Sequence, residues 1–508
     1  MVKRKEVRLM GKGNRNRIAK EQEKAEKKKE LERKMRRQRR IKIATAVLVP
    51  CFAVVLIGAI VLGSLSAAGK FLRSTISVTS DNYEIDNAMM SYFFNSQVQY
   101  YLSNTSNSSI DQTKSLKSQR YSDTQTWFDY FMSSTKAQVQ QLVILAEAAK
   151  AEGVELTDEE KTSIEDQLDA IDKQAQAQGM TFDKYIGSIY GSGVTREDVQ
   201  RCMELYTLAN SFYEQKYNGF TYSDEELEAY FEENQQTLTV YSYKSYSIKA
   251  EYDSDASEET KTEALEAAKA SADELAACTT PEAFDEWVKA FLKESGEDDE
   301  EEIEKTLEST LTEDTTYSSS SEIAKWAYEE GRKVGDTKVI EGTNKYTVAL
   351  LIKAPAREEY LTKNVRHILF TEDTYGSADA ALEKANAVRK EFSNGEQTAE
   401  AFGALAEKYT EDTGSATKGG QYSDVCKGEM VEAFEEWLFD EERTVGETGI
   451  VETDYGYHLM YFEGDGDIAW KAKATEAKRA EDYEALYETY ESKYTVNFSD
   501  KLLKKINA

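Results

Sequence analysis

Residues 437–462 read WLFDEERTVGETGIVETDYGYHLMYF, and they repeat the segment WAYEEGRKVGDTKVIEGTNKYTVALL at residues 326–351. The two segments align without a gap at an offset of 111 positions, with identical residues at Trp326/Trp437, Gly335/Gly446 and Tyr346/Tyr457. Agreement at this density is not expected by chance, and it indicates two copies of one structural unit. Each segment has the pattern of a helix end, a glycine turn and two strands.

A strand and a long helix are predicted ahead of each repeated segment. In the first copy they cover residues 241–250 and 259–277, and in the second copy residues 365–370 and 378–392. We therefore expect two similar α+β domains in tandem, at residues 237–356 and 362–465.

The two copies differ where chemistry is expected. The chain of 508 residues has only two histidines, His367 and His458, and both lie in the second copy, each in a short apolar run. The first copy has Thr347 at the position of His458, no histidine in its opening strand, and an acidic stretch at residues 294–304. We interpret the first copy as a binding or spacing domain and the second as the one that performs chemistry. From the residues alone, two histidines in apolar strands also fit ordinary core positions.

The second copy carries an ordered set of motifs. These are RHIL at 366–369, TED at 410–412, GG at 419–420, GEMVEAF at 428–434 and YGYH at 455–458. With them, residues 364–464 resemble a parvulin-type peptidyl-prolyl isomerase domain. The resemblance implies catalytic residues His367, Asp412 and His458 and substrate-binding residues Met430, Phe434, Tyr422 and Thr453.

The chain departs from the family at one place. The family commonly follows its Gly-Gly pair with Asp-Leu-Gly, whereas residues 421–423 read QYS, which puts Tyr422 at a position of the apolar pocket. The preference or rate for proline is expected to change there.

The chemistry of such a domain fits this set of residues. Rotation about a peptide bond costs about 18–20 kcal/mol because of amide resonance, and X-Pro bonds exchange slowly between two isomers. A catalyst of this rotation needs an apolar pocket for the proline ring and polar groups that favour the twisted state, but no cofactor or metal. We assign the histidines a positioning role. The alternative, that His367, His458 and Asp412 bind a divalent cation, lacks a recognisable ligand spacing.

The N-terminal part of the chain predicts a membrane anchor. Residues 1–42 carry 19 Lys or Arg against 6 Glu, so they have a net charge of +13, and the rest of the chain carries −44. The uncharged run 43–68 would span about 39 Å as a helix, enough for a bilayer core of about 30 Å. The basic flank predicts a single-pass protein with a cytoplasmic N-terminus and the bulk of the chain outside the cytoplasm. A cleaved signal peptide is the alternative.

The basic tail at 1–42 is expected to contact anionic lipid. It could also bind nucleic acid, but it has no aromatic residue for base stacking, so no nucleic-acid partner is predicted.

Residues 75–236 are predicted to form a helical module. We expect helices at 127–151, 159–178 and 196–217, with capping boxes at 157–160 and 223–226 and helix stops at Gly153 and Gly179. Seven apolar or aromatic positions could form a cradle for unfolded chains or could simply pack the helices: Phe93, Tyr100, Phe128, Phe131, Leu205, Tyr206 and Phe212. Residues 467–508 are expected to add a helix that packs back on this module.

The whole pattern is similar to extracytoplasmic foldases of the PrsA and SurA kind. The resemblance implies a membrane-anchored isomerase whose partners are unfolded, newly exported, proline-containing polypeptides. One alternative is a holdase in which neither copy turns over substrate. Another is an envelope interaction protein whose basic arm binds a cytoplasmic partner.

Overall fold

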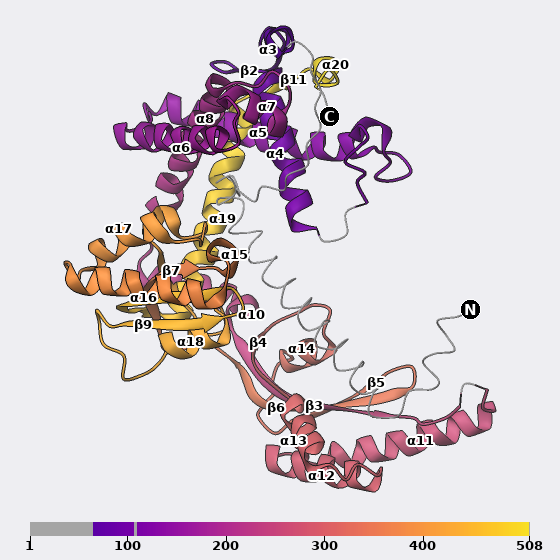
Figure 1. The fold of residues 1–508 in the computed structure, drawn as a ribbon. Coiled ribbons are helices and arrows are strands. Elements are labelled where there is room, and N and C mark those ends of the chain that lie inside the picture. Colours follow the sequence, from indigo (N-terminus) through magenta and orange to yellow (C-terminus); the bar gives the residue numbers. More distant parts are fainter. Residues whose placement is uncertain (1–64, 106–108, 254, 507–508) are drawn as a thin grey trace. The chain divides into compact units, whose positions relative to one another are not determined.

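The computed structural model describes residues 65–105, 109–253 and 255–506 (Figure 1). The described residues form two units, one made of those up to Phe220 and those from Glu481 on, the other of those from Thr221 to Ala480. The predicted membrane anchor, residues 43–68, lies outside the described residues except for its last four, which belong to helix α3 (Leu65–Arg73). Within the described ranges, no helix has both the length and the apolar character needed to cross a membrane.

Unit 1 is mainly helical. The three predicted helices are present as α5 (Trp127–Ala151), α6 (Asp158–Ala177) and α8 (Arg196–Gly219), accompanied by α4 (Asn87–Asn104), η2 (Leu116–Ser118) and α7 (Phe182–Tyr190). The capping box of α6 joins Thr157 and Glu160 as predicted, and Gly153 and Gly179 have φ values of 75° and 68°. These left-handed conformations end the helices because glycine adopts them without steric cost.

A small sheet in unit 1 was not predicted in full. Strands β1 (Ile76–Thr79) and β2 (Glu84–Asp86) pair with β11 (Asn497–Phe498) in the order β11-β1-β2. The chain then forms α20 (Asp500–Leu503), and the Lys117 ammonium donates to the Lys504 carbonyl at 2.8 Å. The last residues of the described chain are thus fastened to unit 1.

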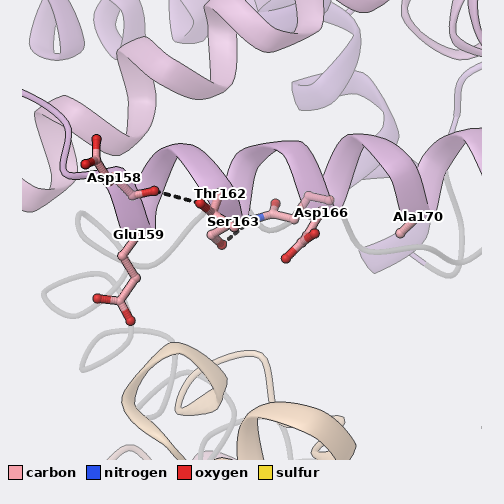
Figure 2. Close-up of a pocket in the computed structure, with 7 residues that line it drawn as sticks. Asp158, Glu159, Thr162, Ser163, Asp166 and Ala170 are labelled. Carbon is pink, nitrogen blue, oxygen red and sulfur yellow. Dashed lines mark hydrogen bonds between the residues drawn. The ribbon is translucent and has the colours of Figure 1, made fainter.

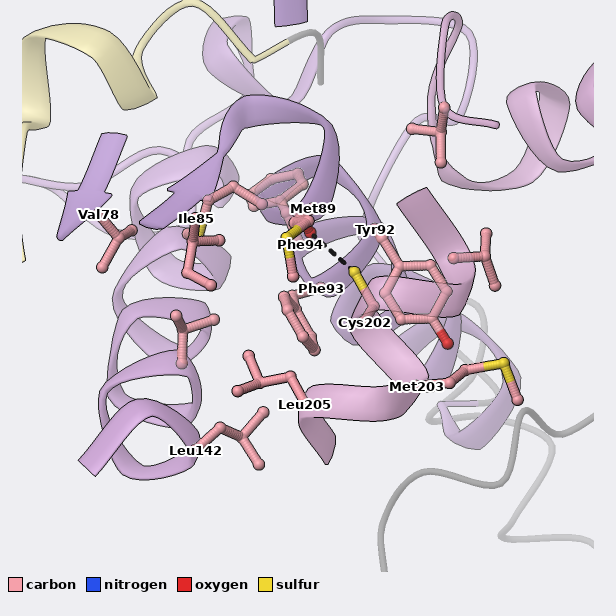
Figure 3. Packing of buried hydrophobic residues seen from close by; sticks show 14 of the residues in the cluster. Val78, Ile85, Met89, Tyr92, Phe93, Phe94, Leu142, Cys202, Met203 and Leu205 are labelled. Carbon is pink, nitrogen blue, oxygen red and sulfur yellow. Dashed lines mark hydrogen bonds between the residues drawn. The ribbon is translucent and has the colours of Figure 1, made fainter. Parts of the chain in front are cut away.

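The core of unit 1 contains most of the seven residues that were candidates for a cradle for unfolded chains. Five of the seven candidate positions are almost fully buried, and Figure 3 shows part of the cluster that they belong to; they are Phe93, Phe128, Phe131, Leu205 and Phe212. Those side chains pack the helices. Tyr100 and Tyr206 instead line a hollow between α4, α5 and α8, together with amide side chains such as Gln97 and Gln138.

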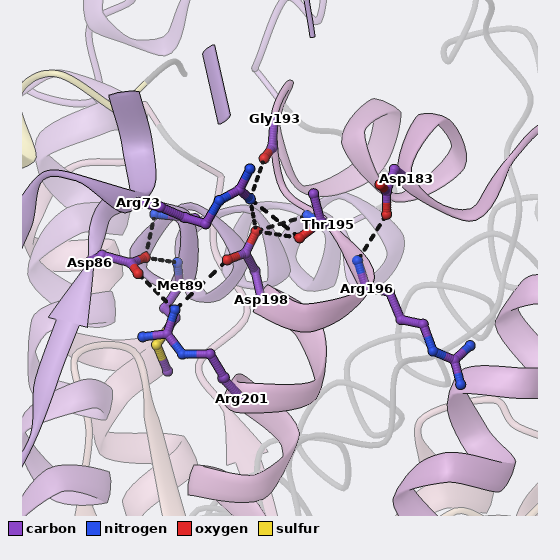
Figure 4. A network of polar contacts seen from close by, with 10 residues as sticks. Arg73, Asp86, Met89, Asp183, Gly193, Thr195, Arg196, Asp198 and Arg201 are labelled. Carbon is purple, nitrogen blue, oxygen red and sulfur yellow. Dashed lines mark hydrogen bonds and ion pairs between the residues drawn. The ribbon is translucent and has the colours of Figure 1, made fainter. Parts of the chain in front are cut away.

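A network of charged side chains joins α3, the first described helix, to the rest of unit 1 (Figure 4). The fully buried Asp198 of α8 accepts a hydrogen bond from Arg73 of α3 at 2.6 Å. Arg201 donates to Asp86, the N-cap residue of α4, at 2.8 Å. The network therefore ties α3 to α8 and to the start of α4.

Unit 2 contains two sheet domains with the same topology. The first has β3 (Val240–Lys249), α11 (Glu258–Leu275), α12 (Pro281–Glu294), α13 (Glu300–Thr310), β4 (Leu311–Thr316), α14 (Glu322–Ala327), β5 (Thr337–Glu341) and β6 (Lys345–Ala356). The second has β7 (Leu361–Phe370), α15 (Glu372–Tyr375), α16 (Ala378–Asn394), α17 (Ala399–Tyr409), η3 (Ala416–Lys418), β8 (Gln421–Val425), α18 (Glu432–Leu438), β9 (Thr448–Thr453) and β10 (Gly456–Ile468). Their strand orders are β4-β3-β6-β5 and β8-β7-β10-β9.

The repeat in the sequence extends to the register of the strands. Thr337 pairs with Leu350 in the first sheet and Thr448 pairs with Tyr461 in the second, so both partners are shifted by 111 positions. In each copy one helix covers one face of the sheet and the longer helices cover the other. In the first copy these are α14 on one side and α11 to α13 on the other (Figure 1).

Two further helices and the first part of a third complete unit 2. Helices α9 (Asp224–Glu233) and α10 (Gln235–Leu238) pack on Trp470 and Ala474 of α19 (Ala469–Lys493). The module predicted at 75–236 thus runs past the division at residue 220. The segment predicted at 467–508 contributes residues up to 480 to unit 2 and the rest to unit 1.

Candidate active site

The two histidines lie on the two central strands of the second sheet and face the same side. On β7 and β10, His367 is the cross-strand partner of Met460 and His458 that of Leu369, so the histidines sit diagonally across the ladder. Diagonal neighbours on one face are within reach of long side chains. The two Nδ1 atoms are 3.0 Å apart, and the side chains are only 4% and 6% exposed.

Asp412 reaches the other side of His367 from the loop that follows α17. One of its carboxylate oxygens, Oδ2, is 2.9 Å from His367 Nε2. The loop is fixed by Thr410, whose hydroxyl oxygen accepts hydrogen bonds from the amides of Leu369 on β7 and of Asp412 itself. The turn that follows brings Gly420 close to β7, where its carbonyl accepts the His367 amide at 2.9 Å. Gly420 has a φ of 74°, and a Cβ there would lie 2.2 Å from the His367 carbonyl oxygen.

The predicted substrate-binding residues lie around the same three side chains. The ring of Phe434, on α18, stands edge-on to both imidazoles, with centroid distances of 5.5 Å to each. Met430 packs beside it in the same apolar cluster, and the Thr453 hydroxyl is 2.8 Å from His458 Nε2. The fold therefore brings the predicted residues together in one place.

Tyr422 differs from the expectation of a purely apolar pocket residue. Its ring packs on the apolar cluster of β7 and α18, with its centroid 5.4 Å from that of His367. Its hydroxyl donates a hydrogen bond of 2.8 Å to Asp412 Oδ2. The residue that departs from the family pattern is thus also part of the polar centre.

Sequence reasoning missed Ser415. Its side chain is fully buried, and its hydroxyl lies 2.6 Å from Asp412 Oδ2 and 3.3 Å from His367 Nε2. The signal available in the sequence was a hydroxyl residue three positions after the predicted aspartate, in a turn that contains Gly414.

The polar contacts give the two imidazoles a defined proton pattern. Burial would raise the pKa of Asp412, but the contacts with His367, Ser415 and Tyr422 outweigh it and hold that pKa well below its usual range. Asp412 is therefore a carboxylate that can only accept, so His367 carries its proton on Nε2. Burial, with the neighbouring His367, lowers the pKa of His458 to about 3. His458 is thus neutral at pH 7, with its Nδ1 facing His367 Nδ1 and its Nε2 facing the Thr453 hydroxyl.

The same pattern bears on metal binding. In this chain of contacts Asp412 and His458 engage both ring nitrogens of His367, so neither nitrogen is directed at open space. Within the described part of the chain, no group of three or more His, Cys, Asp or Glu side chains is arranged to hold a metal ion.

The first copy has a different arrangement at the equivalent place. Ser245, the cross-strand partner of Ala349, stands at the position of His367, and Thr347 stands at that of His458. Helix α13 fills the interval that in the second copy contains the Asp412 loop. A hydroxyl contact of 2.8 Å between Ser247 and Thr347 spans the two central strands.

A hollow in unit 1 is unrelated to this centre. It lies over the exposed face of α6, and Figure 2 shows that its lining comes from this one helix, including Asp158, Thr162, Ser163 and Asp166. Its hydroxyls and amides bond within the helix, as in the contact of Thr162 with the Asp158 carbonyl. Nothing in it resembles a catalytic arrangement.

Comparison with known proteins identifies the class of the second sheet domain. Residues 351–463 match the family of PPIC-type PPIASE domains, and these residues contain every side chain of the centre described above. Over part of its length the chain resembles parvulin-type foldases of the PrsA and SurA kind.

Individual relatives are similar over part of their length. The foldase protein PrsA of Staphylococcus epidermidis is 29% identical over 212 residues, which are 38% of this chain and 64% of that protein. The chaperone SurA of Alcanivorax borkumensis is 28% identical over 156 residues, 29% of this chain and 35% of that protein. The chain thus spans less than two thirds of the length of these curated relatives.

Solved structures are similar over part of this chain. A crystal structure of the peptidylprolyl isomerase PrsA from Bacillus cereus shares 26% identity over 29% of this chain and 56% of that chain, with a TM-score of 0.18. PrsA from Bacillus subtilis shares 17% identity over 62% of this chain and 90% of that chain, with a TM-score of 0.19.

Proposed function

We propose that this protein is a membrane-anchored foldase that catalyses cis/trans isomerisation of X-Pro bonds in exported polypeptides and also acts as a chaperone. The observation that carries the proposal is the continuous contact of Asp412, His367 and His458 beside the ring of Phe434, within the part of the chain that matches the isomerase family. In this proposal His367, Asp412 and His458 are the catalytic residues, and Met430, Phe434, Tyr422 and Thr453 bind the substrate.

The mechanism follows from the energy of the amide bond. The barrier of about 18–20 kcal/mol comes from resonance that is lost when the bond is perpendicular, so a catalyst must bind this twisted state more tightly than either planar isomer. Phe434, Met430 and the ring of Tyr422 hold the pyrrolidine ring. His458 is neutral and both histidines are engaged with fixed partners, so they orient donors and acceptors around the twisting amide without forming a covalent bond.

The test is a protease-coupled assay with a prolyl peptide on the full-length chain. Replacing His458 and Asp412 by alanine together is expected to lower kcat/KM more than about tenfold, which corresponds to about 1.4 kcal/mol of transition-state stabilisation. Thr347→Ala is the matched control, because Thr347 is the residue of the first copy at the position of His458. Full activity in the double variant would remove the site assignment, and an inactive control would show that the loss is not specific.

A holdase activity that is independent of isomerisation is the second candidate. It is favoured by the hollow between α4, α5 and α8, where Tyr100 and Tyr206 stand beside the amides of Gln97, Gln138 and Asn210. Amide side chains can pair with the backbone of any extended polypeptide, and the aromatic rings supply apolar contact. The double variant should then suppress aggregation of an unfolded test protein as well as the wild type does. Loss of suppression together with isomerase activity would contradict a separate holdase function.

The anchor and location are part of the same proposal. The uncharged run 43–68 and the basic flank before it support insertion with the N-terminus in the cytoplasm. The net charge of −44 after residue 42 favours basic clients over acidic ones, an effect that weakens as salt rises. Separation of membranes from soluble protein tests the anchor, since deletion of residues 43–64 should release the chain.

A further inference from the structure

Asp412 is held by an unusual number of donors on a single oxygen. Its Oδ2 atom lies 2.9 Å from His367 Nε2, 2.6 Å from Ser415 Oγ and 2.8 Å from the Tyr422 hydroxyl. Its other oxygen accepts the amide of Gly414 at 3.1 Å. Of the two hydroxyls, that of Ser415 is on a fully buried side chain and also lies 3.3 Å from His367 Nε2.

The position of Ser415 sets the direction of its hydrogen bond. A serine hydroxyl has one proton and two lone pairs, whereas a carboxylate oxygen has only lone pairs. At 2.6 Å from Asp412, the proton of Ser415 must therefore point at the carboxylate. The lone pairs of Ser415 are left to face His367 Nε2, so the proton on that nitrogen lies between two acceptors.

We infer that Ser415 is a positioning residue for the isomerase centre, which holds His367 in the tautomer protonated on Nε2. The tautomer of His367 in turn decides that of His458, because the two rings meet through their Nδ1 atoms and only one of them can donate there. The buried hydroxyl, together with the Asp412 carboxylate that it donates to, thus sets the hydrogen-bond direction of both histidines. Its role in catalysis rests on the proposed function, whereas its effect on the tautomers does not.

The chain itself offers a clean test, since it has only two histidines. In full-length protein labelled with ¹⁵N-histidine, the four ring nitrogens give separate resonances that report which of them carry protons. The inference predicts protonated Nε2 and unprotonated Nδ1 for His367, and the reverse for His458. A wild-type spectrum with the opposite pattern, or with averaged tautomers, would overturn it without any variant.

Ser415→Ala is then expected to change this pattern and to lower kcat/KM by about tenfold, since a hydrogen bond to a charged group has been removed. The matched control is Thr362→Ala. Thr362 is also fully buried on β7, and its hydroxyl donates to a carboxylate, that of Asp424, at 2.9 Å, but it does not touch the histidines. The control should lose stability while its ring-nitrogen resonances stay unchanged.

The outcomes separate the two claims. If Ser415→Ala leaves the ring nitrogens as in the wild type, Ser415 has no positioning role, whatever happens to activity. If the tautomers change but the wild type shows no isomerase activity, the inference on Ser415 holds and the proposed function fails. A changed ring pattern with unchanged kcat/KM would show that the tautomers do not matter for catalysis and would contradict the catalytic part of the inference.

Discussion

Acidification should destabilise the isomerase domain through His458. This side chain is 6% exposed, and burial together with His367 lowers its pKa to about 3, against about 6.5 in an unfolded chain. Between these two values the unfolded state binds a proton that the folded state does not. The free energy of unfolding therefore rises with pH between these two pKa values. The contribution of His458 to stability is lost as the pH falls through the same interval.

The size of the effect follows from the width of the window. Each pKa unit corresponds to about 1.4 kcal/mol, so lowering the pH from 6.5 to 5 should remove about 2 kcal/mol of stability through His458. The low pKa of Asp412 acts in the same direction, but only below the usual range of an aspartate, and so outside this interval. Glu435, whose burial raises its pKa, acts in the opposite direction.

The assay is a urea titration of the full-length protein at several pH values, followed through the NMR signals of the two histidines. These signals report on this domain alone. The variant His458→Gln lacks the titration of His458 but keeps that of Glu435. The difference between wild type and variant in the slope of the unfolding free energy against pH therefore isolates the contribution of the histidine. Equal slopes, or a His458 signal that titrates near pH 6.5 in the folded protein, would refute the reasoning.

Three other changes test separate parts of the structure. Phe434→Ala should cost about 3–5 kcal/mol of domain stability, measured by urea unfolding, and should raise KM for a prolyl peptide because the ring that holds proline is gone. Gly420→Ala should shift the histidine signals and lower the unfolding midpoint, since the left-handed backbone alone costs about 1–2 kcal/mol and the new Cβ would meet the His367 carbonyl. Asp198→Asn should remove the charge that pairs with the partly exposed Arg73 and destabilise unit 1 by about 2 kcal/mol, seen by hydrogen exchange in α8, with isomerase activity unchanged.

The repeat made three of the four strands of each sheet predictable, whereas the edge strands β4 and β8 were not predicted. A glycine turn followed by two strands is a local pattern, and the alternation of side chains between the two faces of a strand fixes the register once one face is buried. Thr337 and Thr448 therefore occupy equivalent ladder positions although their neighbours differ. The long helices were predictable for a similar reason, since capping residues such as Thr157 mark their ends.

Other parts depended on information that a local pattern does not carry. Helices α12 and α13 were missed because the acidic stretch at 294–304 obscured the signals around it, although Thr280 caps α12 and Pro281 occupies its first turn. Ser415 and the hydroxyl of Tyr422 were missed for another reason. Their contact with Asp412 forms only when the turn after α17 folds against β7, and no periodicity marks it.

The two copies show that the polar centre is separable from the fold that carries it. In the second copy, one face of the sheet packs Ile368, Phe370 and Leu459 against α16 and α17, while the histidines lie on the opposite face. The first copy retains the equivalent packing on both faces, with Val348 and Leu350 on one side and Trp326 on the other. The histidines can therefore be lost without loss of the sheet, because burial of apolar surface stabilises the fold and does not require the paired imidazoles. It follows that the fold of the first copy is no argument for isomerase activity there, and that activity must be argued from Asp412, His367 and His458 alone.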